Sequence, residues 1–166
     1  MSFVAILMGS ASDWPVMQAT TEVLDQLGVE FEVRVTSAHR TPAATMSYVQ
    51  EATERGCGVF VCAAGLAAHL AGAVAAHTVR PVIGVPIDAG PLSGFDALLS
   101  TVQMPGGIPV ATVAIGKAGA RNAGYLAVQM LSLADSALAD RLASERQANV
   151  DKIQTQNAEL QSQLKD

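Results

Sequence analysis

A short polar loop near residue 40 carries two neighbouring side chains that are suited to chemistry on an anion. It reads Ser37-Ala38-His39-Arg40-Thr41-Pro42. Histidine has the ordinary pKa that allows proton transfer near neutral pH, and the arginine guanidinium presents a rigid fork of N–H donors to phosphate or carboxylate. Adjacent residues of an extended loop point in different directions, so Arg40 could hold a ligand while His39 transfers protons. The alternative is a solvated surface loop in which Thr41-Pro42 only starts the next helix.

A second candidate segment, Gly9-Ser10-Ala11-Ser12-Asp13, lies between an apolar run and a helical pattern. Its backbone N–H groups, the hydroxyls of Ser10 and Ser12 and the positive end of the helix dipole could together hold a phosphate. Asp13 would be repelled by a phosphate and suits a ribose diol better. The alternative is that Ser12 or Asp13 only caps the helix, with Pro15 in its first turn. The two interpretations can hold together.

The third candidate segment runs from residue 63 to residue 72 and is rich in glycine and alanine, which permits close approach of a ligand or another helix. Its His69 is either a site residue or a histidine at the edge of the core that bonds a backbone carbonyl. His77 fits the structural interpretation better. The chain has no Walker-type glycine-lysine loop, GxGxxG or serine-nucleophile elbow. The pattern therefore favours proton transfer on a small anionic ligand without a metal or a dinucleotide.

Apolar runs alternate with helical patterns and would position these loops. Strands are predicted over residues 3–8, 31–35, 59–63, 82–85 and 110–115, and helices over 14–27, 43–55, 66–77, 95–102 and 120–133. Such alternation is typical of an α/β, doubly wound three-layer sandwich with a flavodoxin-like central parallel sheet. Ligands of such sheets bind beyond the carboxyl ends of the strands. The three segments and residues 86–90 should therefore converge.

The C-terminal part has a different pattern, so we expect one catalytic domain over residues 1–134 and a helical tail over 135–166. Apolar residues with one polar member recur at spacings of three and four, as in a heptad: Val150, Ile153, Asn157, Leu160 and Leu164. Two heptads are too few for an independent coiled coil. We expect this helix to pack on its own domain or, in the favoured interpretation, on a neighbouring subunit.

Composition excludes several classes of protein. Half of the residues are hydrophobic and 15% are charged, which predicts a buried core. The net charge of −5 and the absence of a dense basic run argue against nucleic acid as a partner. The start of the chain predicts a strand and no signal peptide, and the uncharged stretch 56–79 predicts a buried strand and helix and no membrane span. Cys57 and Cys62 should lie on opposite faces of one strand, and two isolated thiols indicate a reducing, cytoplasmic compartment.

The chain resembles the N(5)-carboxyaminoimidazole ribonucleotide mutase family of purine biosynthesis, the catalytic subunit of phosphoribosylaminoimidazole carboxylase. The resemblance extends from about residue 3 to about residue 142. It rests on segments in the family's order and spacing: MGSASDW (8–14), SAHRTP (37–42), AAHL (67–70), PVIGVP (81–86), LSG (92–94), VQMPGGIPV (102–110) and IG (115–116).

The resemblance implies an isomerase that moves a carboxylate from the exocyclic nitrogen of the substrate to a ring carbon, without ATP, metal, biotin or another cofactor. His39 is then the general acid and base. By the same resemblance, Ser10, Asp13 and Arg40 hold the substrate. Ser12 and His69 are further candidate contacts, and Ser37 and the backbone at Gly65 are expected to contact the migrating carboxylate. Relatives of this family assemble as octamers.

Three alternatives to the mutase stay open. The nearest is the related carboxylase, which joins free aminoimidazole ribonucleotide to carbon dioxide on the same fold, although the arginine after the histidine and the AAHL segment resemble the mutase type. The others are a different isomerase or lyase for a sugar phosphate and a flavodoxin-like binding module. The chain also departs from the family at Ala63 and Leu66, where glycine is usual, and at Ala71, where proline is usual. A leucine at 66 would narrow or reshape the pocket.

Overall fold

A computed structural model describes residues 2–164 of the chain. A five-stranded parallel sheet forms the centre of the protein. The strand order is β2-β1-β3-β4-β5, and all neighbouring strands run parallel. The strands are β1 (Phe3–Met8), β2 (Phe31–Val35), β3 (Cys57–Gly65), β4 (Val82–Ile87) and β5 (Ala111–Thr112).

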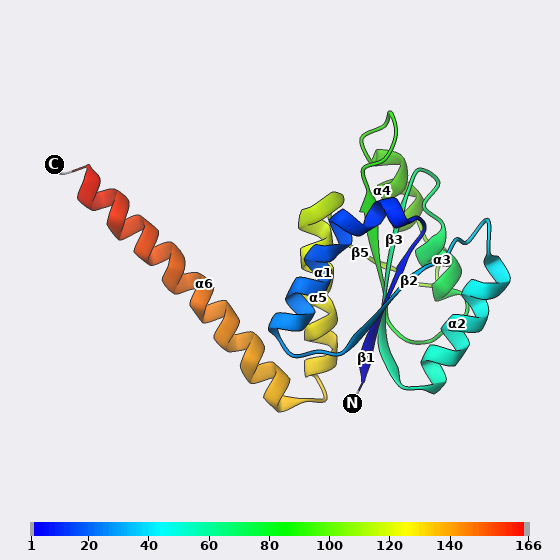
Figure 1. Cartoon of the computed structure of the whole chain (residues 1–166), viewed down its shortest axis with the longest axis horizontal. Coiled ribbons are helices and arrows are strands. Elements are labelled where there is room, and N and C mark those ends of the chain that lie inside the picture. The colour runs from blue at the N-terminus through cyan, green and yellow to red at the C-terminus, as the bar shows by residue number, and fades with distance from the viewer. Residues whose placement is uncertain (1, 165–166) are drawn as a thin grey trace.

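Helices cover both faces of this sheet (Figure 1). One face carries α1 (Trp14–Gln26) and α5 (Gly116–Ser132), and the other carries α2 (Pro42–Glu54), α3 (Leu70–Ala75) and α4 (Phe95–Val102). The doubly wound, flavodoxin-like sandwich predicted from the sequence is therefore confirmed.

The central strands β1, β3 and β4 are apolar because helices cover them on both sides. Every residue of β1 is buried, and its side chains alternate between a core under α1 and α5 and a core under α2 and α3. Such strands appear in the sequence as unbroken apolar runs. The helices α1 and α5 approach closely at Gly124, where a Cβ atom would lie 2.9 Å from the Cβ of Val23.

Three predicted elements differ from the structure by three or more residues at one end. The helix expected over residues 66–77 is only α3, because residues 66–69 form a loop in which Leu66 has a φ of 56°. That left-handed value is incompatible with an α-helix. The strand expected over 110–115 shortens to β5, and α5 begins at Gly116 rather than at Ala120.

The predicted placement of Cys57 and Cys62 on opposite faces of β3 is wrong. Both thiols are buried in the core under α2 and α3, and neither is in a disulfide. The alternation is broken by a register shift, in which Phe3 pairs with Cys57 but Val4 pairs with Val59. The extra residue, Gly58, returns the chain to the same face.

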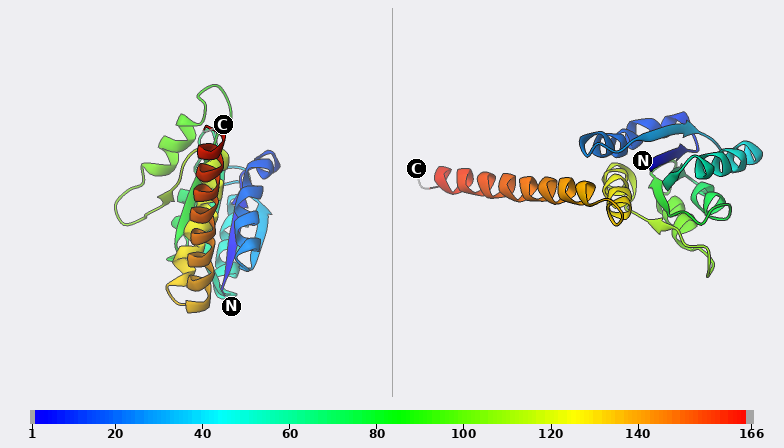
Figure 2. Two further views of the ribbon diagram at one scale, coloured as in Figure 1. Left: turned by 90° about the vertical axis from the view of Figure 1, so that its left-hand side faces the viewer. Right: turned by 90° about the horizontal axis from the view of Figure 1, so that it is seen from below.

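The last helix, α6 (Ser136–Gln163), begins on the domain and then leaves it, as Figure 1 and the right-hand view of Figure 2 show. Asp135 Oδ1 accepts the Leu138 N–H at 3.0 Å, Leu138 is buried, and Arg141 Nε donates to the Leu27 carbonyl at 2.9 Å. From Arg146 to Leu164 every residue is exposed. The predicted domain (1–134) and tail (135–166) include three residues outside the described ones: Met1, Lys165 and Asp166. No helix between residues 2 and 164 is long and apolar enough to cross a membrane.

Candidate active site

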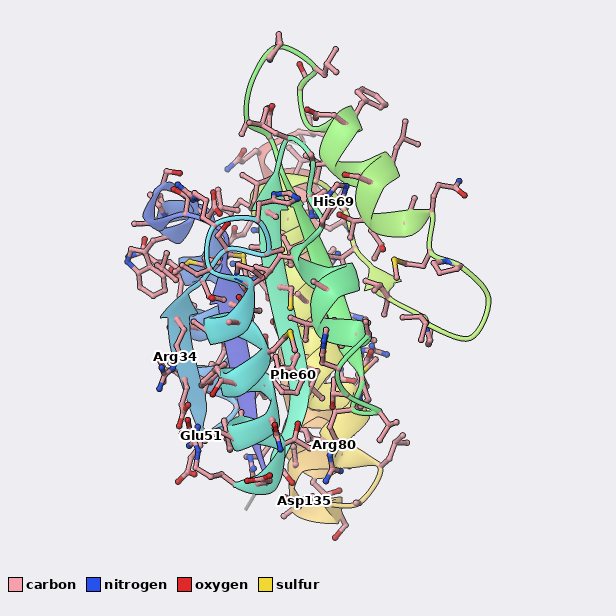
Figure 3. All side chains as sticks on the ribbon, turned by 90° about the vertical axis from the view of Figure 1, so that its right-hand side faces the viewer. Arg34, Glu51, Phe60, His69, Arg80 and Asp135 are labelled. Carbon is pink, nitrogen blue, oxygen red and sulfur yellow. The ribbon has the colours of Figure 1, made fainter. Side chains whose placement is uncertain are left out.

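The loops that leave β1, β2 and β3 surround a cavity of about 460 Å³ at the carboxyl end of the sheet. Figure 3 shows His69 at this end of the molecule, opposite to Arg80 and Asp135. The walls between the polar groups are backbone and small apolar side chains. All the site residues predicted from the sequence line the cavity: Ser10, Ser12, Asp13, Ser37, His39, Arg40, Gly65 and His69.

Strand order explains why these loops meet. β1 lies between β2 and β3, so the three loops start beside one another. The Thr36 N–H donates to the Met8 carbonyl at 2.8 Å, and the Gly9 N–H donates to the Ala63 carbonyl at 3.0 Å. These bonds extend the sheet by one residue, after which the three chains separate to form the cavity.

The loop after β1 forms a capping box on a short 3-10 turn (Ala11–Asp13) that leads into α1. The Ser10 N–H donates to Asp13 Oδ2 at 3.2 Å, and Ser10 Oγ accepts both the Ser12 N–H at 3.3 Å and the Ser12 hydroxyl at 2.8 Å. The proton of the Ser10 hydroxyl thus stays available to a ligand. Burial raises the pKa of Asp13, although hydrogen bonds from Ser10 and Ser12 oppose that shift. The predicted capping of the helix by Ser12 or Asp13 is wrong, because Ser10 caps the 3-10 turn and Asp13, the N-cap of α1, makes no side-chain capping bond. The groups of this turn face the cavity.

Arg40 connects the loop after β2 to the loop after β1. Its Nη2 donates to the Gly9 carbonyl at 2.8 Å and its Nε to Ser37 Oγ at 3.4 Å. A guanidinium has five N–H donors, so three remain after these two contacts. Arg40 is exposed and lines the cavity, which leaves these donors accessible to an anion.

His39 and His69 come from different loops and meet in the cavity. His39 Nε2 lies 2.8 Å from His69 Nδ1, and the two rings are edge to face with centroids 4.9 Å apart. One nitrogen donates and the other accepts, so a single hydrogen bond joins the two rings. His69 therefore is not the core histidine that bonds a carbonyl. His77 does bond a backbone carbonyl, with Nδ1 at 2.7 Å from the Ala73 carbonyl oxygen, but it is exposed and lies outside the core.

The loop after β3 places small groups against the cavity. At Gly65 an added Cβ would lie 2.7 Å from the Ala89 Cβ and 3.3 Å from the Ile87 carbonyl oxygen, so β3 and β4 need glycine here. Leu66 lines the cavity with its side chain half exposed. Its φ of 56° is the left-handed conformation that favours glycine.

Several supporting groups were not indicated by the sequence. The Ala68 N–H donates to Ser100 Oγ at 3.0 Å. The Thr101 hydroxyl, which donates to the Ala97 carbonyl at 2.7 Å, also lies 3.4 Å from the Ala68 carbonyl oxygen. Ser100 and Thr101 both lie on α4, far from the loop in sequence. Three threonines, at positions 36, 41 and 45, hold the loop after β2. Among residues 2–164, no three His, Cys, Asp or Glu side chains are grouped so as to hold a metal ion.

Comparisons with known protein families, sequences and structures agree with the resemblance seen in the sequence. The family model for AIRC, AIR carboxylase, matches residues 3–152. The N5-carboxyaminoimidazole ribonucleotide mutase of Bacillus subtilis (strain 168) is 54% identical over 144 residues, which cover 87% of this chain and 89% of that protein. The protein of the same name from Escherichia coli (strain K12) is 51% identical over 150 residues, or 90% of this chain and 89% of that one. The crystal structure of Treponema denticola PurE has a TM-score of 0.87 at 30% identity and covers 96% of this chain and 99% of that one. The chain belongs to the AIR carboxylase family.

Proposed function

We propose that this chain is an isomerase of purine biosynthesis that converts N(5)-carboxyaminoimidazole ribonucleotide to 4-carboxy-5-aminoimidazole ribonucleotide. The observation that carries the proposal is the juxtaposition of His39 and Arg40, in one turn, with the Ser10 loop in a single cavity. Curated relatives with the mutase name, matched over most of their length, support the same reaction.

The substrate phosphate fits between Arg40 and the loop after β1. Arg40 is bonded to the Gly9 carbonyl, so its remaining N–H donors lie beside the Ser10 hydroxyl and the start of the helical turn. Asp13 faces the same cavity and suits the ribose hydroxyls. This arrangement directs the imidazole ring towards His39, His69 and the loop after β3. There, Ser37 and the backbone at Gly65 are the proposed contacts of the migrating carboxylate.

His39 is the proposed general acid and base. As the bond between the exocyclic nitrogen and the carboxylate breaks, protonated His39 donates its proton to that nitrogen and carbon dioxide is released. The enamine-like ring carbon then attacks the carbon dioxide to form the new C–C bond. Neutral His39 removes the proton from that ring carbon, which restores the aromatic ring and the initial state of the enzyme. His69, the hydrogen-bond partner of His39, contacts the substrate and orients the His39 ring.

Carbon dioxide must stay beside the ring carbon between the two bond changes. Much of the apolar wall of the cavity consists of small groups, with Ala38, Ala64, Ala67 and Ala89 among its lining residues beside Leu66 and Leu70. Such a wall leaves little room for water, and a held molecule reacts at an effective concentration far above that in solution.

Isotope transfer tests the proposal. The enzyme receives substrate labelled in the carbamate carbon together with excess unlabelled bicarbonate. Label retained in the ring-carboxylated product supports direct transfer. Product without label would identify the carboxylase, which uses free carbon dioxide, and absence of product would refute both reactions.

We also propose that the protein forms a homo-oligomer, an octamer as in its family, in which the distal half of α6 packs on a neighbouring subunit. Support comes from its exposed apolar stripe, Val150, Ile153, Leu160 and Leu164. Light scattering after gel filtration should give the mass of an octamer, and I153E/L160E should lower it, whereas T155E on the opposite side of α6 should not. An unchanged mass in the double variant would refute this packing. The two buried free thiols support a cytoplasmic location.

A further inference from the structure

The segment that carries His39 and Arg40 is a single closed turn. At its base the Thr41 N–H donates to the Ser37 carbonyl at 2.9 Å, and the Ser37 N–H donates to Thr41 Oγ1 at 2.9 Å. The Thr41 hydroxyl in turn donates to the Ser37 carbonyl at 3.2 Å. Thr41 stands at the N-cap of α2, but its side chain makes no capping bond there. It closes the turn instead.

A pair of buried threonines lies directly beneath this base. Thr36 follows β2, Thr45 lies in the first turn of α2, and their hydroxyl oxygens are 2.6 Å apart. Both residues are buried, with 9% and 3% of their surface exposed. Thr45 Oγ1 also lies 3.1 Å from the Thr41 carbonyl oxygen. The Thr45 hydroxyl has one proton, which it donates to the Thr41 carbonyl, so the Thr36 hydroxyl must donate to Thr45 Oγ1.

This chain of bonds connects the two ends of the turn. Thr36 is bonded to the sheet through the Met8 carbonyl, and Thr45 belongs to α2. The hydroxyl pair therefore sets the separation between the end of β2 and the start of α2. His39 and Arg40 lie at the exposed apex between these two points. A change of spacing at the base moves both side chains relative to the loops after β1 and β3.

We propose that Thr36 and Thr45 are positioning residues, which hold His39 against His69 and Arg40 against the Gly9 carbonyl through the hydroxyl pair. The inference rests on the proposed function for its kinetic consequence. Valine has nearly the shape of threonine, so the packing would survive its substitution. The hydrogen bond between the two hydroxyls, which fixes the first turn of α2 relative to the strand, would be lost.

The test compares Thr45→Val with Thr45→Ser and with a matched control, Thr20→Val. Thr20 is also fully buried and donates to the Ala120 carbonyl at 2.7 Å, but it lies between α1 and α5 on the other face of the sheet. In the full-length protein, Thr45→Val should lower kcat/KM for the carbamate substrate by roughly tenfold to a hundredfold, as expected for a small misplacement of reacting groups. Thr45→Ser should restore most of the activity. Thr20→Val should lower Tm about as much as Thr45→Val does, because each removes one buried hydroxyl, but it should leave kcat and KM unchanged.

A second readout separates this inference from the proposed function. NMR of the histidine rings should show the contact between His39 and His69 in the wild type, in Thr45→Ser and in Thr20→Val, and its loss in Thr45→Val. If the wild type lacks mutase activity, the proposed function fails and the ring contact alone decides the positioning role. The double variant Thr36→Val/Thr45→Val leaves no hydroxyl of the pair without its partner and takes the place of Thr45→Val if that variant does not fold. Unchanged kinetics and ring contact in the valine variant, or an equal loss in Thr20→Val, would overturn the proposal.

Discussion

Replacing Arg40 with alanine should show how much the binding of the substrate phosphate contributes to catalysis. Arg40 is exposed, and its contacts with the rest of the protein are two hydrogen bonds, to the Gly9 carbonyl and to Ser37 Oγ. Losing these exposed contacts should cost about 0.5–1 kcal/mol of stability. The variant should therefore fold, and its kinetic change reports on the ligand.

The expected magnitude follows from the donors that Arg40 leaves free. Two of its remaining N–H groups can meet a phosphate, and a hydrogen bond to a charged group contributes about 1.5–3 kcal/mol. Since the guanidinium is exposed to solvent, the lower end applies, and the two bonds together contribute about 3 kcal/mol. At about 1.4 kcal/mol for each factor of ten, kcat/KM should fall roughly a hundredfold. Arg40→Lys keeps the charge but not the fork, so its kcat/KM should lie between the values of the wild type and of Arg40→Ala.

The assay is a cycle in which the substrate is truncated as well as the enzyme. Wild type and Arg40→Ala are each measured with the carbamate ribonucleotide and with its riboside, which lacks the 5′-phosphate. If Arg40 holds the phosphate, the alanine variant should lose roughly a hundredfold in kcat/KM on the ribonucleotide and about threefold or less on the riboside. Equal losses on both substrates would refute the phosphate assignment and place Arg40 at the migrating carboxylate.

Three further changes have definite outcomes. His39→Asn should fold with the wild-type Tm and lose about 10²–10⁴-fold in kcat, since general acid and base catalysis contributes that much; near-full turnover would remove His39 from its role. Gly65→Ala should lower Tm and activity together, because its Cβ would lie 2.7 Å from that of Ala89 and such overpacking costs about 1–3 kcal/mol. The hydrogen bond from Arg55 lowers the pKa of Glu32 to about 2, so this pair stabilises the fold above the ordinary pKa of 4.5 and loses that effect as the pH falls towards 2. Both side chains are more than a third exposed, so Glu32→Gln should lower the free energy of unfolding by only about 1 kcal/mol at pH 7. If the variant is still less stable by the same amount at pH 2, the loss does not come from the ion pair.

The sheet and the convergence of the three loops were predictable because both follow from short-range pattern. Apolar runs separated by helical patterns indicate a parallel sheet, and parallel strands place their following loops at one edge. Once the order of β2, β1 and β3 places three loops together, His39, Arg40, Ser10 and His69 have to share a cavity. Their chemical types were visible in the sequence, although the family resemblance alone assigned them their roles.

The features that the sequence did not predict depend on contacts between distant segments. The register shift at Gly58 reverses the alternation on which the placement of Cys57 and Cys62 was based. The loop at Leu66 has a helical composition and packs closely against the end of β4. Leu66 has a left-handed φ there, so α3 cannot start at this residue. Thr36 and Thr45 are nine positions apart and carry no motif, so only the packing of α2 on the end of β2 shows that their hydroxyls meet.

The placement of His39 and Arg40 in one turn gives phosphate binding a direct path to the chemical step. Arg40 is bonded to Ser37 and to the Gly9 carbonyl, so an anion on the guanidinium restrains the whole turn that carries His39. Binding energy from the non-reacting phosphate would then serve to orient the acid and base, and its loss should appear in kcat as well as in KM. For this reason the riboside should turn over more slowly than the ribonucleotide even at saturation. If its kcat equals that of the ribonucleotide, the phosphate only anchors the substrate, and His39 is held in place by the threonine base of the turn alone.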